Sequence, residues 1–232
     1  MIYISMDDTD SLESRGTGSL ARTIAKKLAT NYNIFGVTRH QLYEHPDIPF
    51  TSHNTCAVIH VDDEGDDLVN QLFEIVKNEM LMDFIEGSDP GIAVTEGHHI
   101  TPSLIAFGKD AKNIILNQQQ ARTLAKNLKI RLEGLGGTEE GVIGTMAGLG
   151  LAKSRYDGRF LMPGPSEIMG SNSVSDLLDM GVDAVYTLDG HKITDGTIYS
   201  RNERLVKPCP VGDKVILYVE EKEGILKAVN RD

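Results

Sequence analysis

Residues 2–28 have the sequence IYISMDDTDSLESRGTGSLARTIAKKL, in which a strand pattern and a helix pattern flank an acidic loop. Residues 2–6 form a short apolar segment that ends at a polar turn, as a buried strand does. From Thr17 onward, apolar side chains recur at helical spacing at positions 20, 21, 24, 25 and 28. The start of the chain therefore predicts a strand, an acidic loop and a helix.

The pattern continues to about residue 131. Alternating segments predict strands at 34–43 and 55–61, with the loop at 45–50 between them. Helices are predicted at about 66–80 and within 102–128, and a short strand is predicted at 92–94. We expect an α/β domain over residues 1–131.

A glycine-rich segment, residues 131–150, divides the chain near residue 132. Beyond it the pattern predicts helices at about 142–151 and 174–180, strands at 159–162 and 184–188, and β-rich segments around residues 198, 205 and 215–219. We expect an α+β domain over residues 132–232. Because no Pro/Ser linker separates the two domains, we expect them to pack tightly.

Composition limits the functions open to this chain. Its 232 residues carry 23 Lys and Arg against 34 Asp and Glu, a net charge of −11, so any contact with RNA phosphates must be local. The two cysteines, Cys56 and Cys209, form no CxxC pair, which disfavours a four-ligand zinc site and a disulfide scaffold and favours a reducing, cytoplasmic compartment. The acidic N-terminus does not resemble a signal peptide, and no apolar run is long enough for a membrane span.

The acidic loop is the strongest candidate site. Asp7, Asp8 and Asp10 supply three carboxylates within four residues, and Thr9 and Ser11 add hydroxyls. Such hard oxygen ligands suit Mg²⁺, which usually shares its coordination with substrate phosphates. The alternative is a solvated turn that caps the next helix.

Residues Arg15, Gly16, Thr17, Gly18 and Ser19 follow the acidic loop and lead into the predicted helix. Backbone N–H groups and the helix dipole favour phosphate at such a terminus. We therefore expect these residues, together with Thr9 and Ser11, to bind a nucleotide.

Within the glycine-rich segment 131–150, residues 134–148 have two competing explanations. Gly136 and Gly141 have the spacing that opens a Walker A loop, but Val142 and Ile143 stand where Lys and Ser/Thr would be. Gly144 lies on one predicted helix face with the glycine four residues later, which suits close packing as well as phosphate approach. The nucleotide hypothesis assigns Gly141 and Gly144 to cofactor binding.

Three other residues are weaker candidates. His98 and His99 are adjacent, so on a strand they would point to opposite faces, which disfavours a shared metal. Cys56 lies in a predicted strand and is expected to be buried and unreactive.

Four motifs in order resemble the archaeal tRNA-isoleucine 2-agmatinylcytidine synthetases, which use ATP to join agmatine to a tRNA cytidine. They are residues 7–11, 45–50 (HPDIPF), 89–92 (DPGI) and 141–144 (GVIG) with Ala147 and the glycines around it. The resemblance implies a kinase-like domain packed on a ferredoxin-like domain, with ATP and Mg²⁺ held by Asp7, Asp8 and Asp10. It also implies phosphorylation of Thr17 or Ser19.

The sequence departs from that family in ways that affect the acceptor. The family continues into an OB-fold and a zinc ribbon, whereas the two cysteines here cannot build a four-cysteine ribbon, and residues 51–55 lack two expected cations. We therefore expect an ATP- and Mg²⁺-dependent phosphoryl-transfer enzyme whose acceptor, a small amine or tRNA, stays open. The alternatives are a tRNA-modification protein that relies on a partner for RNA binding and a non-catalytic nucleotide-binding regulator. A homodimer is compatible with the sequence.

Overall fold

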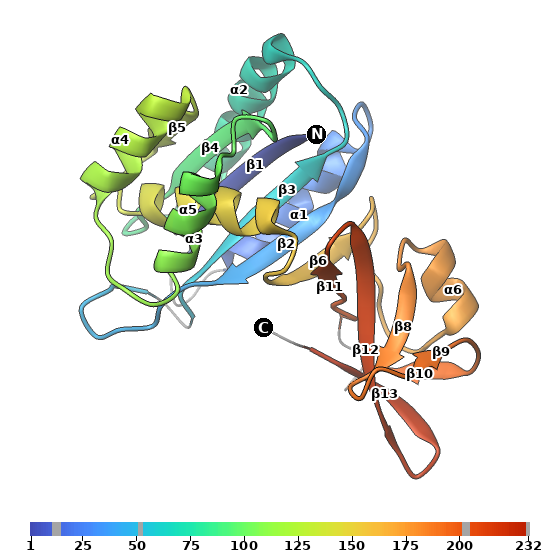
Figure 1. The fold of residues 1–232 in the computed structure, drawn as a ribbon. Helices are drawn as coiled ribbons and strands as arrows, with labels where there is room; N and C mark the ends of the chain where they lie inside the picture. Colours follow the sequence, from blue (N-terminus) through green and yellow to red (C-terminus); the bar gives the residue numbers. More distant parts are fainter. Residues whose placement is uncertain (11–14, 51–52, 201–204, 231–232) are drawn as a thin grey trace.

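The computed structural model describes residues 1–10, 15–50, 53–200 and 205–230. Two β-sheets organise them, one formed by strands up to residue 163 and one formed by strands from residue 172 onward (Figure 1). Within the described ranges, no helix is long and apolar enough to cross a bilayer.

The first sheet has six strands in the order β5-β4-β1-β3-β2-β6, and every neighbouring pair is antiparallel. Its strands are β1 (Ile2–Asp7), β2 (Ile34–Gln41), β3 (Thr55–Val61), β4 (Gly91–Glu96), β5 (Arg131–Gly134) and β6 (Arg159–Pro163). β1 lies inside the sheet, with β3 and β4 on either side, so its last residue is flanked by the ends of neighbouring strands.

Helices cover both faces of this sheet (Figure 1). α1 (Thr17–Leu28) and α2 (Asp66–Met82) pack on one face, and α5 (Gly141–Ser154) lies directly on the other, with α3 (Pro102–Asp110) and α4 (Gln118–Leu128) packed against it. Side chains alternate along β1 accordingly: Ile2, Ile4 and Met6 lie in the core beneath α1 and α2, whereas Tyr3 lies in the core beneath α5. By the same alternation Asp7, the last strand residue, faces α5.

The second sheet is mixed, with the strand order β7-β10-β13-β12-β8-β9, and β11 also pairs with β12. Its elements are β7 (Asn172–Ser173), α6 (Val174–Asp179), β8 (Ala184–Thr187), β9 (Lys192–Ile193), β10 (Thr197–Tyr199), β11 (Cys209–Val211), β12 (Lys214–Lys222) and β13 (Ile225–Val229). Val174 and Leu177 of α6 pack with Leu217 and Val219 of β12 in a separate core.

The mixed α/β architecture expected from the sequence is confirmed, but the two sheets divide elsewhere than expected. β5, α5 and β6 all belong to the first sheet and its covering layers, so the change of sheet follows Pro163 rather than residue 131. The glycines near residue 132 resemble a boundary in sequence, whereas in the structure they permit close packing within one unit. The ferredoxin-like arrangement is not confirmed, because the described part of the second unit has one helix on a sheet of parallel and antiparallel pairs.

Candidate active site

Asp7 ends β1 and lies against the first turn of α5. Asp7 is only 8% exposed. A Cβ on Gly144 would lie 1.8 Å from Asp7 Oδ2, so only glycine at this helix position leaves room for the carboxylate. Gly144 therefore allows an acidic side chain to be buried between a strand end and a helix.

Burial raises the pKa of Asp7 well above its ordinary value, and the nearby charges of Asp8 and Asp10 raise it further. A carboxyl group with a raised pKa resists losing its proton until a cation stabilises the charged form. The electrostatics of the site therefore favour an added positive charge.

Asp8 follows in a left-handed backbone conformation, with φ 51°, a region that Asp and Asn tolerate better than most residues. Burial, followed by the charges of Asp89, Asp10 and Glu140, raises the pKa of Asp8 to about 6. Together with Asp7, five carboxylates therefore interact at the end of β1.

Asp10 joins the acidic loop to the start of α1. Thr17 Oγ1 donates a hydrogen bond to Asp10 Oδ1 (2.9 Å), and the Thr17 N–H contacts the same oxygen at 3.4 Å. Thr9 Oγ1 in turn donates to Thr17 Oγ1 (3.1 Å). Part of the acidic loop therefore does cap the next helix, as the alternative hypothesis expected, while Asp7 and Asp8 do not take part in these bonds.

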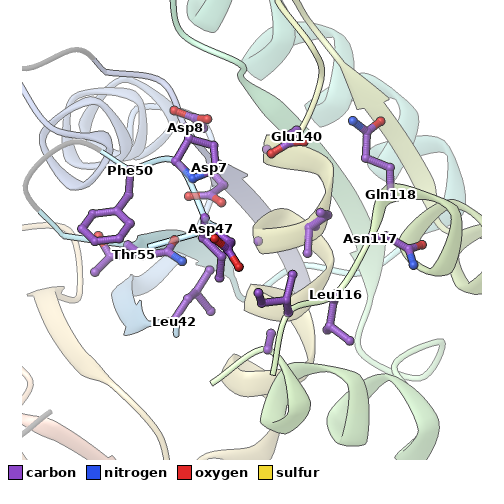
Figure 2. A pocket seen from close by; sticks show the side chains of 18 of the residues that line it. Asp7, Asp8, Leu42, Asp47, Phe50, Thr55, Leu116, Asn117, Gln118 and Glu140 are labelled. Atoms are coloured by element: carbon purple, nitrogen blue, oxygen red, sulfur yellow. The ribbon is translucent and has the colours of Figure 1, made fainter. Parts of the chain in front are cut away.

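A cavity of about 540 Å³ opens beside these aspartates. Four segments line it: the acidic loop after β1, the β2–β3 connection, the α3–α4 connection and the start of α5 (Figure 2). Its carboxylates come from Asp7, Asp8, Asp10, Asp47 and Glu140. Among the described residues its lining includes no Lys or Arg, so the cavity is strongly acidic.

The rest of the lining is largely apolar. Phe50 and Ile114 are exposed at 41% and 52%, and Leu116 lies beside Asn117 and Gln118 on the side of the cavity formed by the α3–α4 connection (Figure 2). The cavity therefore joins a charged region, suited to a cation, to an apolar region, suited to a base or an alkyl chain.

Residues 15–19, at the start of α1, do not line this cavity. Arg15 forms an ion pair with Asp83 (2.6 Å), and a Cβ on Gly18 would lie 2.6 Å from Leu161 Cδ1. Thr17 is buried, and the Ser19 N–H donates to Gly16 O (2.7 Å). The predicted role of Arg15, Gly16, Thr17, Gly18 and Ser19 in nucleotide binding stays a prediction, as does that of Thr9. Ser11 lies outside the described residues.

The start of α5 does reach the cavity, but its glycines have a packing role. A Cβ on Gly141 would lie 2.4 Å from Asp89 O and 2.7 Å from Gly91 N. The N–H groups of residues 141, 142 and 143 donate to backbone oxygens of Asp89, Glu139 and Glu140. Close packing therefore accounts for Gly141 and Gly144, and their part in nucleotide binding stays a prediction.

The carboxylates fit a shared magnesium ion better than a closed metal site. Within the described ranges, no group of three or more His, Cys, Asp or Glu side chains is arranged so that it could hold a metal ion by itself. Mg²⁺ keeps several waters and commonly takes only one or two protein carboxylates, with substrate phosphates completing its shell. Asp7 and Asp8, whose pKa values are raised by burial and by neighbouring carboxylates, match that need.

Two acidic residues of the cavity were not singled out as site residues from the sequence. Asp47 lies in the quoted loop at 45–50, and Glu140 immediately precedes α5. A carboxylate beside a glycine-rich helix start was the available signal for Glu140. His98 and His99 also differ from expectation: they lie in a turn with ring centroids 4.1 Å apart, not on opposite faces of a strand. Cys56 is buried, as expected.

Two features characterise this protein: an antiparallel sheet covered by helices on both faces, and an acidic cavity at the end of strand β1. Solved structures of TiaS, a tRNAIle2 agmatidine synthetase, have this fold. The apo TiaS structure matches with a TM-score of 0.53 at 21% identity, and the TiaS–tRNA(Ile2)–ATP complex matches with 0.54 at 22%. A complex of TiaS with tRNA(Ile2), AMPCPP and agmatine gives 0.52 at 20%.

Each of these matches covers 64% of this chain and 35–36% of the TiaS chain. The chain thus corresponds to about a third of the length of those proteins. No protein-family model matches the sequence, and no curated protein matches it either. The resemblance expected from the four motifs is confirmed at the level of the fold.

Proposed function

We propose that this protein is an ATP- and Mg²⁺-dependent phosphoryl-transfer enzyme that acts in tRNA modification, with its active site in the acidic cavity. The observation that carries the proposal is the group of carboxylates from Asp7, Asp8 and Asp10 beside Glu140, in a cavity lined by no described Lys or Arg. Such a group is costly unless a cation joins it. The shared fold with TiaS, which has been solved with ATP, supports a nucleotide as the source of the phosphates.

In this proposal Asp7 and Asp8 hold the metal, and Asp10 keeps the acidic loop fixed to α1 through Thr17. When bound, Mg²⁺ neutralises charge on the transferring phosphates and orients them. The apolar lining around Phe50 and Ile114 is suited to the base or to the acceptor. Because phosphoryl transfer depends mainly on positioning and charge neutralisation, no further nucleophile from the protein is required.

The acceptor is a small amine or a tRNA nucleotide. An acidic cavity favours an amine, because a protonated amine would itself offset the carboxylates. Because the described lining offers no Lys or Arg, the backbone phosphates of a tRNA acceptor would have to be bound by residues elsewhere. A non-catalytic nucleotide-binding regulator is the remaining candidate, and it differs by binding ATP without turning it over.

Isothermal titration calorimetry with Mg²⁺ and ATP tests the proposal. We expect Asp8→Asn to weaken Mg²⁺-ATP binding at least tenfold, because one of the proposed metal ligands is lost. Asp110→Asn is the matched control, since Asp110 is exposed at the end of α3 and does not line the cavity. Unchanged affinity in a folded Asp8→Asn protein would show that the acidic loop is only a helix-capping turn.

Filter binding of tRNA at increasing salt separates the acceptors. We expect the protein to bind tRNA no more tightly than it binds heparin, a nonspecific polyanion, because its net charge is −11. Submicromolar binding at physiological salt that resists heparin would instead favour tRNA bound by this chain.

A further inference from the structure

A series of hydrogen-bonded side chains leads from β3 through β2 to the α3–α4 connection, and the proposed chemistry does not use it. Thr38 Oγ1 lies 2.8 Å from His60 Nε2 and 2.8 Å from His40 Nε2. On its other side, His40 Nδ1 lies 3.0 Å from Asp157 Oδ1, and Lys112 Nζ donates to Asp157 Oδ2. His40 is 0% and His60 is 2% exposed, so the sheet end of this series is shielded from water.

The geometry fixes which atoms carry the protons. His40 and Lys112 hold the pKa of Asp157 below its ordinary value, although burial opposes them, so the carboxylate is charged and can only accept. His40 Nδ1–H therefore donates to it. Thr38 can donate its single hydroxyl proton to only one of its two ring partners, and we assign the direction from His60 Nε2–H to Thr38 and from Thr38 to His40 Nε2.

His60 supports this direction. Burial lowers the pKa of His60 well below its ordinary value, so its ring is neutral. With the proton on Nε2, its Nδ1 is a bare acceptor, and that atom is buried without a hydrogen-bond partner in the described part of the structure. The reverse direction would leave a buried N–H donor there, which proteins tolerate less well than an unused acceptor.

The outer end of the series lies at the wall of the cavity. Residues 111–119, which comprise the α3–α4 connection and the first two residues of α4, supply seven lining residues: Ala111, Ile114, Ile115, Leu116, Asn117, Gln118 and Gln119. Lys112 is within this segment. Besides the Lys112–Asp157 bond, two hydrogen bonds join this segment to more distant described residues: Tyr43 N–H donates to Ala111 O (2.9 Å), and Gln118 Nε2 donates to Thr138 O (2.8 Å).

We propose that His40, Asp157 and Lys112 are positioning residues that fix the α3–α4 wall of the cavity to the central sheet. The Lys112–Asp157 pair is part-buried, with side chains 29% and 17% exposed, so it is less screened than a surface pair. His40 prevents the Asp157 carboxylate from turning away, because it holds the other oxygen. The position of the wall around Ile114 and Leu116 therefore depends on the charged Asp157 carboxylate, which binds Lys112 of that wall.

Amide hydrogen exchange of the protein without ligand tests this inference. Lys112→Met is expected to speed exchange of the Tyr43 N–H, which is bonded to Ala111 O, at least tenfold, with no matching change at Ile4 in β1. Lys112→Arg is expected to restore slow exchange. Lys109→Met is the matched control, since Lys109 is an exposed lysine in the last turn of α3 and no ion pair is recorded for it among the described residues.

Equal acceleration at Tyr43 and Ile4 in Lys112→Met would mean a loss of global stability and would overturn the inference, as would slow exchange at both. The ¹⁵N spectrum provides a second readout: His40 is expected as the Nδ1–H tautomer and His60 as the Nε2–H tautomer, and the opposite pair would overturn the proton direction.

The inference about ligand binding rests on the proposed function. We expect Lys112→Met to weaken Mg²⁺-ATP binding about fivefold, Lys112→Arg to preserve it and Lys109→Met to leave it unchanged. Unaltered affinity in Lys112→Met would mean that the wall does not position the nucleotide. If the wild-type protein does not bind Mg²⁺-ATP, the proposed function fails, and the exchange experiment still decides whether the wall is fixed by Lys112.

Discussion

α1 and α5 each begin after a glycine-bearing segment, and of these two helices only α5 begins at the cavity. α1 follows Gly16, whose neighbours contact Asp10, Asp83 and Leu161. α5 follows residues 134–140 and lies against Asp7. Glycines before a helix therefore do not by themselves indicate a phosphate site; what the glycine makes room for decides its role.

The difference is clearest at Gly18 and Gly144. A side chain at Gly18 would meet the flexible end of Leu161, whereas one at Gly144 would occupy the position of the Asp7 carboxylate. The first glycine permits packing of helix on sheet, and the second permits a buried acid beside a cavity. The following predictions test this contrast, from the largest expected effect to the smallest.

Gly144→Ala should lower the free energy of unfolding by about 2 kcal/mol, because the new methyl displaces a buried carboxylate in a packed core. It should also weaken Mg²⁺-ATP binding, since Asp7 moves with it. Gly18→Ala, the paired variant, should change stability by less than about 0.5 kcal/mol, because Leu161 can adjust and alanine improves helix propensity. Urea unfolding and calorimetry measure both quantities. Equal effects of the two substitutions would remove the contrast.

Asp8→Asn should make the protein without ligand more stable at pH 7, by about 1 kcal/mol. The pKa of Asp8 in the folded protein is about 6, raised from 3.8, so folding binds a proton between these values and stability falls as pH rises from about 4 to 6. Solvent screening of the partly exposed side chain keeps the effect below the full value of the shift. Thermal unfolding from pH 4 to 7 should show a flatter profile in Asp8→Asn. An identical profile in both proteins would argue against carboxylate crowding.

Thr17→Val should cost about 1 kcal/mol, because it removes the donor to Asp10 Oδ1 from a buried position without changing the shape of the side chain. Thr17→Ser keeps the hydroxyl and is the matched control. Chemical denaturation measures the loss. If valine and serine were equally tolerated, the acidic loop would not be held to α1 through this hydroxyl.

Arg15→Ala should have the smallest effect, below about 0.5 kcal/mol, because its pair with Asp83 is exposed. From its place outside the cavity lining, we also expect less than a twofold change in Mg²⁺-ATP affinity. A loss of tenfold or more would restore the nucleotide-binding role that the sequence predicts for Arg15.

The sequence predicted several elements well, because the apolar residues of those elements have a clear period. The helices at α1 and α2 and the strands β1 and β3 lie where apolar spacing placed them. The change of sheet could not be located in this way, because β6 joins the first sheet through pairing with β2, a contact distant in sequence. Periodicity identifies a strand but not its partner.

The same limit applies to the cavity. Asp7, Asp8 and Asp10 could be chosen from the sequence because they are close neighbours after a strand. Glu140 and the α3–α4 wall approach them only through the packing of α5 on the sheet and of α3 on α5. The hydrogen-bonded side chains from His60 to Lys112 come from four separate segments of the polypeptide, so no local sequence pattern indicates them.

The central claim is that the carboxylates after β1 hold a divalent cation shared with ATP. Crystals grown with Mn²⁺ and a non-hydrolysable ATP analogue would test it directly, because Mn²⁺ replaces Mg²⁺ and scatters anomalously. The account predicts an anomalous peak in the cavity within bonding distance of Asp7 or Asp8, with the analogue's phosphates on its open side. A bound analogue with no peak there, or with its phosphates at Ser19 away from the cavity, would contradict the account.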